Sequence, residues 1–233
     1  MRKLRMKNAT ILILLVTAAL LTRVGAQVPS DLLARANKGN IRAQVEVGNM
    51  YALGKGVNRD ADKAMDWFRI AAEKGDAEAQ YRLGGMYDVG HISKQDPVTA
   101  IKWYTLSANQ HYRDAEYRLG VMYELGRGVK ADNVVAARWY IRAAEAGRPE
   151  AQAKSGLFYE QGQGGLPKDY KLAAKWYLLA AQNGRPEAEF KMGDFYEHGL
   201  GVQRNKDAAI QWYTKSAEHG YGPAADALRL LQQ

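Results

Sequence analysis

The sequence of 233 residues contains no cysteine. Disulfide bonds are therefore excluded, and so are zinc and iron–sulfur sites that depend on thiolate ligands. Histidine is scarce as well. His91 and His111 stand alone, and neither His198 nor His219 is paired with another histidine at the i, i+4 spacing of a helical metal site. We expect no metal ion and no cofactor.

Catalytic motifs are also missing. The sequence contains no nucleophile elbow, zincin motif or kinase signature. Gly-x-Gly segments do occur, but none follows a strand pattern and none carries the lysine of a P-loop. They begin at Gly54, Gly126, Gly162 and Gly199. The sequence therefore does not predict an enzyme.

The apolar stretch near the N-terminus is short. Residues 11–21 make eleven positions, whereas a membrane-spanning helix needs about 20. A basic head precedes this stretch, and Val24-Gly25-Ala26 after it supplies the small or apolar residues of a cleavage site. We predict a signal peptide over residues 1–26 and a mature chain, beginning at Gln27, that is periplasmic or secreted. An uncleaved membrane anchor is the alternative.

The net charge of +8 comes from 33 Lys and Arg against 25 Asp and Glu. Five of the basic residues and no acidic residue fall within 1–26, which leaves 28 against 25, or +3, for the rest of the chain. A nucleic-acid-binding domain would need a basic stripe on the folded part of the protein. We therefore expect no nucleic-acid partner.

One pattern recurs five times in the rest of the chain. A glycine, here called the landmark glycine, is followed three residues later by tyrosine and then by a more distant tryptophan. The landmark glycines are Gly48, Gly84, Gly120, Gly156 and Gly193. Successive tryptophans are 36, 36, 37 and 36 residues apart. A fixed period of this length is typical of a solenoid, whose units pack against their neighbours.

Each unit reads as two helices joined by a turn. In the third unit, Ala115, Leu119 and Met122 fall on one face of a first helix, and Asp132 stands where the second helix needs an N-cap. The equivalent caps are Asp60, Asp96, Asp169 and Asn205. Because glycine weakens a helix, we expect the two helices to cross closely at the landmark glycine. The tryptophans are interpreted as core residues, and a sugar-stacking ladder is the alternative.

The string Ala79-Gln80-Tyr81-Arg82-Leu83-Gly84-Gly85-Met86-Tyr87 resembles the first helix of the Sel-one-like repeat, a relative of the tetratricopeptide repeat. The resemblance recurs five times and implies an all-α, right-handed α/α superhelix that serves as a scaffold for protein complexes. A cysteine-rich branch of the family is linked to β-lactam binding, but this chain lacks the paired cysteines of that branch. The expected organisation is a capping helix at 27–39, repeats 1 to 5 at 40–75, 76–111, 112–147, 148–184 and 185–221, and a second capping helix at 222–233.

By analogy with tetratricopeptide repeats, the concave face is formed by residues three before, one after and four after each landmark glycine, which make one helical stripe. The predicted protein-binding residues are Tyr81, Asp88, Tyr117, Val121, Glu124, Leu157, Glu160, Phe190, Asp194 and Glu197. Aromatic residues beside a row of acids suit an extended peptide with apolar and basic side chains. The alternative is that the acids are only solvated.

These observations favour an exported, non-enzymatic scaffold or adaptor that binds another protein or peptide through its concave face. Two alternatives stay open. The chain could be a secreted effector that binds a host protein, or an enzyme that acts on β-lactams or peptidoglycan, although no nucleophile and base can be identified for the enzyme. The sequence names neither the partner nor the pathway.

Overall fold

The computed structural model describes residues 27–90 and 95–231, so the predicted signal peptide at 1–26 lies outside it. The described residues form helices and contain no β-strand. The helices are α2 (Ser30–Asn37), α3 (Ile41–Leu53), α4 (Ala61–Glu73), α5 (Ala77–Val89), α6 (Pro97–Ala108), α7 (Arg113–Leu125), α8 (Asn133–Glu145), α9 (Pro149–Gln161), α10 (Tyr170–Gln182), α11 (Pro186–His198), α12 (Lys206–Glu218) and α13 (Gly222–Leu231). None of them has the length and apolar content needed to cross a membrane.

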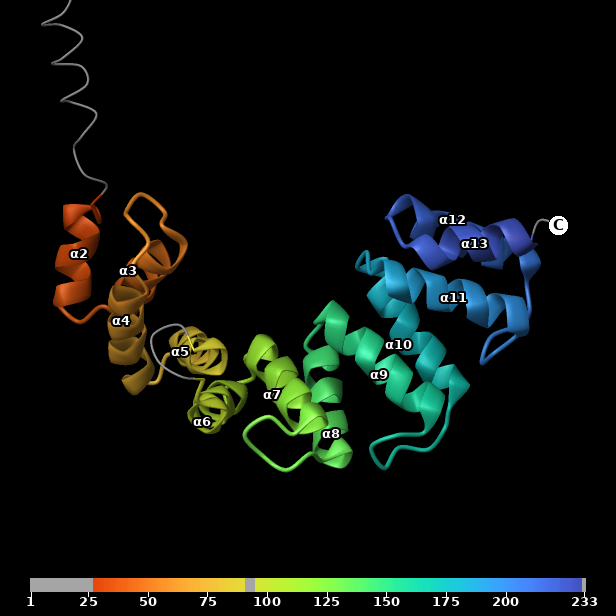
Figure 1. Cartoon of the computed structure of the whole chain (residues 1–233), viewed down its shortest axis with the longest axis horizontal. Helices are drawn as coiled ribbons and strands as arrows, with labels where there is room; N and C mark the ends of the chain where they lie inside the picture. The colour runs from red at the N-terminus through yellow and green to blue at the C-terminus, as the bar shows by residue number, and fades with distance from the viewer. Residues whose placement is uncertain (1–26, 91–94, 232–233) are drawn as a thin grey trace, which may run out of the picture.

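The helices stack in chain order into an arc, with α2 at one end and α13 at the other (Figure 1). Each helix packs mainly against the helix before it and the helix after it. Repeats 1 to 5 therefore correspond to the hairpins α3–α4, α5–α6, α7–α8, α9–α10 and α11–α12. The predicted all-α solenoid, with a further helix at each end, is confirmed.

The helix ends follow the predicted chemistry. Each first helix ends at a glycine in the left-handed conformation, as at Gly126, where φ is 68°. Each second helix begins after an Asp or Asn whose side chain accepts hydrogen bonds from the first-turn amides, as Asp132 does from Val134 and Val135. The same cap is present at the other four predicted positions. The turn glycine and the cap together fix where one helix stops and the next begins.

The landmark glycine makes room for an aromatic ring. A Cβ atom added to Gly120 would lie 2.6 Å from the ring of Tyr140, and one added to Gly193 would lie 2.5 Å from the ring of Tyr213. The rings at the same position in the other repeats are Phe68, Tyr104 and Tyr177. The second helix therefore packs closely on the landmark glycine, and a buried aromatic ring fills the space that the missing Cβ leaves.

The tryptophans occupy a different position from the one expected. They are half-buried, whereas the residue after each one is buried. Trp103 of repeat 2 packs against a buried cluster formed by repeats 1 and 2, and Trp139 of repeat 3 packs against one formed by repeats 2 and 3. Each of these tryptophans thus joins its own repeat to the preceding one, while the neighbouring aromatic residue holds the two helices of its own hairpin together.

A buried polar residue four positions before each landmark glycine also joins successive repeats. In repeats 1, 2 and 4 it is a glutamine, and Gln80 donates to the carbonyl of Ala72 at 3.1 Å. In repeats 3 and 5 it is a glutamate, which cannot donate. In repeat 3 Arg142 replaces that donor, contacting the Ala108 carbonyl at 3.0 Å and Glu116 at 2.8 Å. In repeat 5 the glutamate is Glu189, which lies 3.1 Å from Lys215 and 2.8 Å from His219. The same connection is therefore made by an uncharged pair in some repeats and by an ion pair in others.

Candidate functional site

The predicted binding face is the set of residues three before, one after and four after each landmark glycine. Open cavities lie along its first two rows. Tyr81 and Gly85 line a cavity of about 230 Å³ around α5, called here the α5 cavity. Leu157 and Phe190 line another of about 230 Å³ between α9 and α11, called the α9–α11 cavity. A third, of about 470 Å³, lies beside Val45 and Asn49.

The aromatic residues of the face are half-buried and stack on neighbouring rings. The ring of Tyr81 lies 5.8 Å from that of Tyr104 and 5.2 Å from that of Tyr112. Phe190 has equivalent contacts of 5.4 Å with Tyr213 and Tyr221. Rings held at these separations form a fixed floor rather than freely moving anchors.

Three further predicted residues share this half-buried level, whereas Asp88 is buried. Val121 and Leu157 are half-buried, and so is Asp194, whose carboxylate lies 3.0 Å from the Nδ1 atom of His198. His219 contacts a different acid, Glu189, at 2.8 Å. No group of three metal-ligating side chains occurs in residues 27–90 and 95–231.

The predicted acids of repeats 3 and 4 are held in a tyrosine–glutamate–lysine network. Glu124 accepts a 2.5 Å hydrogen bond from the hydroxyl of Tyr140 and lies 2.9 Å from the ammonium of Lys154. Glu160 is bound in the same way by Tyr177 at 2.6 Å and Lys191 at 2.9 Å. Each lysine belongs to the next repeat, so the network joins one repeat to the following one.

Burial and the neighbouring glutamate together keep these tyrosines protonated. Burial makes the largest contribution to raising the pKa of Tyr140, and the hydrogen bond to Glu124 raises the pKa further. The pKa values of Tyr177 and Tyr213 are raised for the same two reasons, the latter by Glu197. Each hydroxyl therefore remains a donor to its glutamate.

The lysines of this network were missed in the sequence, although a signal for them exists. The residue two positions before the landmark glycine is basic in repeats 2 to 5. The row consists of Arg82, Arg118, Lys154 and Lys191. It has the same period as the row of acids, and the lysines of repeats 4 and 5 pair with the glutamates of the preceding repeats. Because Glu124 and Glu160 are paired in this way, they do not offer free negative charge to a basic peptide.

Repeats 1 and 2 lack the network. Repeat 1 has Ala52 in place of the acid and Phe68 in place of the tyrosine. In repeat 2 the acid is Asp88, one methylene shorter than glutamate, and its carboxylate lies 2.7 Å from Arg127. Among the described residues, Arg118 consequently has no ion pair, and this half of the face keeps basic groups that are not neutralised by the acid row.

An exposed apolar row borders the same half. Leu53, Val89 and Leu125 end the first helices of repeats 1 to 3, each five positions after the landmark glycine. Their exposed fractions are 72%, 53% and 63%. Repeats 4 and 5 have Gln161 and His198 at this position. Repeats 1 to 3 thus expose a large apolar side chain in a register where repeats 4 and 5 expose a polar one.

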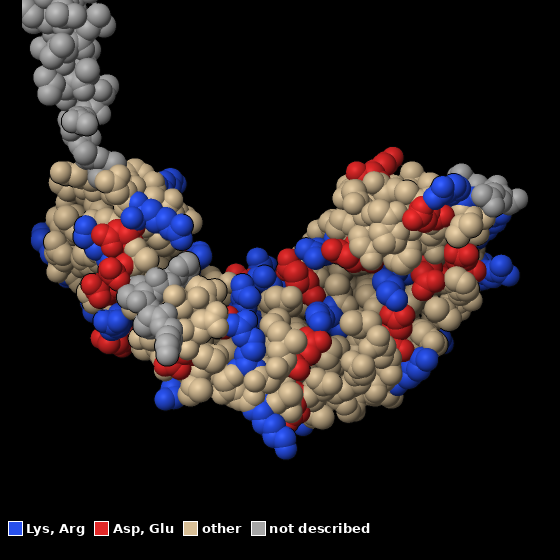
Figure 2. Space-filling model, in the orientation of Figure 1, with Lys and Arg blue, Asp and Glu red and all other residues tan. Residues whose placement is uncertain are grey.

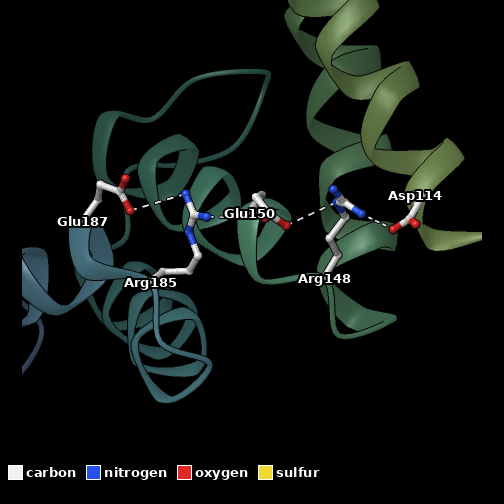
Figure 3. Close-up of polar contacts among 5 residues, drawn as sticks. All are labelled: Asp114, Arg148, Glu150, Arg185 and Glu187. Atoms are coloured by element: carbon white, nitrogen blue, oxygen red, sulfur yellow. Dashed lines mark hydrogen bonds and ion pairs between the residues drawn. The ribbon is translucent and has the colours of Figure 1, made fainter. Parts of the chain in front are cut away.

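The C-terminal half has a further set of ion pairs, shown in Figure 3. Arg148 contacts Asp114 and lies 3.3 Å from Glu150, and Arg185 lies 3.4 Å from both Glu150 and Glu187. This alternating series, called here the arginine–glutamate ladder, connects repeats 3, 4 and 5. In Figure 2 basic and acidic side chains alternate over α9 to α11, whereas Lys and Arg gather in a strip beside α7.

Comparisons with known proteins agree with this architecture. The Sel1 repeat matches residues 41–76, 77–112, 113–147, 149–184 and 186–221. A protective antigen of uropathogenic Escherichia coli with an SLR fold is 39% identical, with a TM-score of 0.82. That match covers 87% of this chain and 43% of the antigen, so the chain spans less than half of the antigen's length.

Two other structures widen the comparison. A Sel1 repeat protein from Oxalobacter formigenes is 38% identical, with a TM-score of 0.72, over 81% of this chain and 75% of that one. An immunity protein from Pseudomonas aeruginosa, 22% identical with a TM-score of 0.50 over 78% of this chain and 67% of its own, shares the fold alone. No curated protein sequence gives a significant match.

Sel1 repeat proteins are generally scaffolds for protein interactions. The same kind of repeat is indicated by the period of the sequence, by the stacked hairpins and by the five matched segments. The chain belongs to the Sel1 repeat family.

Proposed function

We propose that this chain is an exported, non-enzymatic scaffold that binds a protein or peptide partner along the concave face of its repeats. The observation that carries the proposal is the series of open cavities lined by the predicted rows. These cavities recur at Val45 and Asn49, at Tyr81 and Gly85, and at Leu157 and Phe190. An extended segment that runs along the rows would meet one cavity after another.

The proposed absence of enzymatic activity has its own support. The acids and tyrosines that could act as catalytic groups are used in connections between repeats, as Glu124 is by Tyr140 and Lys154. A general base or nucleophile needs a reactive partner within hydrogen-bond reach in a substrate-accessible site. The described residues offer no such pair among the predicted site residues.

Export is proposed from the basic head, the short apolar stretch and the cleavage pattern before Gln27. The 39% identical Escherichia coli protein is described as a protective antigen. This likeness supports a location outside the cytoplasm. N-terminal sequencing of the protein recovered from the envelope or the medium should give Gln27 as the first residue, and retention of residues 1–26 would contradict cleavage.

The binding surface is tested by photo-crosslinking in the producing cell. A benzophenone amino acid placed at Val121 or Leu157 should form crosslinks to a discrete partner, because both side chains lie on the predicted face and are only half-buried. Exposed Arg138 and Glu145 on α8 are the matched control positions. Crosslinks that arise equally from the control positions, or only from them, would show that the predicted face is not the binding surface.

A further inference from the structure

The α5 cavity combines an apolar interior with a basic rim. Its lining includes Ala52, Phe68 and Met86, of which Phe68 and Met86 belong to the buried core. Gly85 leaves this space open, because it has no side chain at the position where repeats 3 and 4 carry Val121 and Leu157. A volume of about 230 Å³ is below the range of roughly 300–1,000 Å³ typical of sites for drug-sized ligands. The cavity therefore suits a side chain of a larger partner rather than a whole cofactor.

Three arginines lie around this opening. Arg59 comes from the turn after α3, Arg82 from α5 and Arg118 from α7. Arg82 is paired with Glu78 at 3.3 Å on the same helix, in an exposed contact that stabilises little and that the arginine can leave. Within the described residues, Arg59 and Arg118 form no ion pair.

The lining contains one acid, Asp88, and its carboxylate is already paired with Arg127 at 2.7 Å. The rim therefore keeps an excess of positive charge that the protein does not neutralise itself. A partner that supplies a carboxylate would complete these pairs, and a guanidinium can bind a carboxylate through two parallel hydrogen bonds.

We propose that the α5 cavity binds an acidic side chain of a partner protein together with the apolar residue next to it. The arginines of the rim hold the carboxylate, and the apolar interior receives the neighbouring side chain. This inference rests on the proposed scaffold function and specifies the partner's chemistry at one point of the binding face. It also reverses the charge that the row of acids had suggested for the partner.

The carboxylate belongs to an internal residue of the partner segment. The exposed row of Leu53, Val89 and Leu125 runs past the cavity, since Val89 lines it and the other two occupy the same register in the repeats on either side. A segment that contacts all three must continue beyond the cavity in both directions. A chain end bound in the cavity would leave part of this apolar row uncovered.

The α9–α11 cavity shows why the acidic side chain of the partner is expected in the α5 cavity and not in this second one. Its lining contains two lysines, Lys154 and Lys191, but these are bound 2.9 Å from Glu124 and Glu160. The charge of this second cavity is thus satisfied within the protein. The α9–α11 cavity is therefore the expected position for an uncharged part of the same partner segment.

The test uses the purified chain from Gln27 to Gln233 and four blocked or free peptides as probes, with binding followed by NMR amide shifts. The first probe is acetyl-Leu-Ala-Glu-Phe-Leu-amide, and the second and third carry Gln or Lys in place of Glu. The fourth, acetyl-Leu-Ala-Gln-Phe with a free C-terminus, offers a terminal carboxylate only. The Glu peptide should bind at least about tenfold more tightly than the Gln peptide, as expected for charge-assisted hydrogen bonds.

Three variants locate the effect. Arg82→Gln and Arg118→Gln should each remove most of the preference for Glu over Gln, whereas exposed Arg138→Gln on α8 should leave it unchanged. Gly85→Leu should block the cavity and abolish binding of every probe. The fold should tolerate it, because a Cβ at Gly85 would lie 3.6 Å from its nearest neighbour, the Tyr104 hydroxyl, and leucine occupies the same position in repeat 4. A thermal melt verifies this.

Equal binding of the Glu and Gln peptides would overturn the proposal, and so would tighter binding of the peptide with the free C-terminus. A preference for Glu that survives in both arginine variants would place the carboxylate elsewhere and overturn it as well. These outcomes are separable from the crosslinking experiment. Crosslinks from Val121 together with equal peptide binding would retain the scaffold function and reject only the acidic anchor.

Discussion

Repeats 1 and 2 differ from repeats 3 to 5 in what happens to their charged side chains. The backbone is the same in both parts, with a turn glycine after each first helix and a capped second helix. In repeats 3 to 5 Glu124 pairs with Lys154 and Glu160 pairs with Lys191. In repeats 1 and 2 Ala52 and the shorter Asp88 stand in place of glutamate. Arg82 and Arg118, which hold the basic position one repeat later, therefore have no glutamate of this row to pair with.

The two parts also begin their first helices differently. Asn40 and Asp76 cap α3 and α5 with their own side chains. At the same position α9 and α11 follow Arg148 and Arg185, which make no side-chain cap and instead form the arginine–glutamate ladder. The same repeat architecture thus carries two surfaces that differ in how their charged side chains are paired. The charges of one half pair between repeats, and those of the other half are the ones that we propose to bind a partner.

The largest effect is expected where a buried charge holds two repeats together. Arg142→Leu removes the main partner of Glu116, which is 1% exposed. Within residues 27–90 and 95–231, its one other basic neighbour is the exposed His111, 3.9 Å away. A buried carboxylate without its partner should cost about 3–5 kcal/mol of unfolding free energy. Urea unfolding of the purified chain measures this cost.

The control for this change is supplied by repeat 2, which has Gln80 and Leu106 at the equivalent positions. The double variant Glu116→Gln and Arg142→Leu should recover most of the loss, because the glutamine can donate to the Ala108 carbonyl as Gln80 donates to that of Ala72. If the double variant is as unstable as the single one, the two kinds of connection are not equivalent.

Much of this architecture could be predicted from the sequence, because it depends on residues with strong local preferences. The landmark glycines, the capping Asp132 and its equivalents, and the period of the tryptophans specify helix ends and repeat number. The role of Trp139 was harder to predict. Periodicity shows that Trp139 and Tyr140 both lie near an apolar face, but it does not show which of two adjacent rings enters the hairpin and which packs on the preceding repeat.

The candidate site was less predictable, because its chemistry depends on pairs of side chains from different repeats. The row that contains Glu124 was correctly recognised as a row of acids, but its neutralisation by Lys154 requires knowing how far one repeat is displaced from the next. The difference between Asp88 and Glu124 is a single methylene group. That difference decides whether an acid reaches the tyrosine of its own hairpin. Neither helix propensity nor the period of the sequence indicates this reach.

A second prediction concerns alkaline pH. Burial and Glu124 raise the pKa of Tyr140 above that of an unfolded tyrosine, which is about 10. The folded chain therefore holds this proton when the unfolded chain has lost it, and stability that is fully present below pH 10 should fall above it by about 1.4 kcal/mol per pH unit for each such tyrosine. Burial raises the pKa of Tyr104 in repeat 2 as well, so repeats 2 to 5 should share this loss, whereas repeat 1 has Phe68 at the same position.

Tyr140→Phe tests this directly, since Phe68 already fills the same position in repeat 1. The variant should have a flatter decline of unfolding free energy between pH 10 and pH 11, by about the slope of one proton. Other titrating groups are common to both proteins and cancel in the comparison. An unchanged slope would mean that Tyr140 ionises as easily in the folded chain as in the unfolded one.

The smallest effect is expected at the arginine–glutamate ladder. Arg185→Gln removes two contacts, with Glu150 and Glu187, but the arginine side chain is 35% exposed and the two acids are 33% and 53% exposed. Ion pairs with this much solvent contact stabilise by less than about 1 kcal/mol, and salt screens them.

In the other half, Asp76→Ala removes a helix cap and should cost about 1 kcal/mol. The two changes therefore differ less in size than in their response to salt. Between low salt and 1 M NaCl, the loss caused by Arg185→Gln should disappear, while that caused by Asp76→Ala should largely persist, because the cap is a local hydrogen bond to a backbone amide. If both losses respond alike to salt, the ladder is held by its geometry rather than by its charges, and the two halves would differ in recognition but not in how they are stabilised.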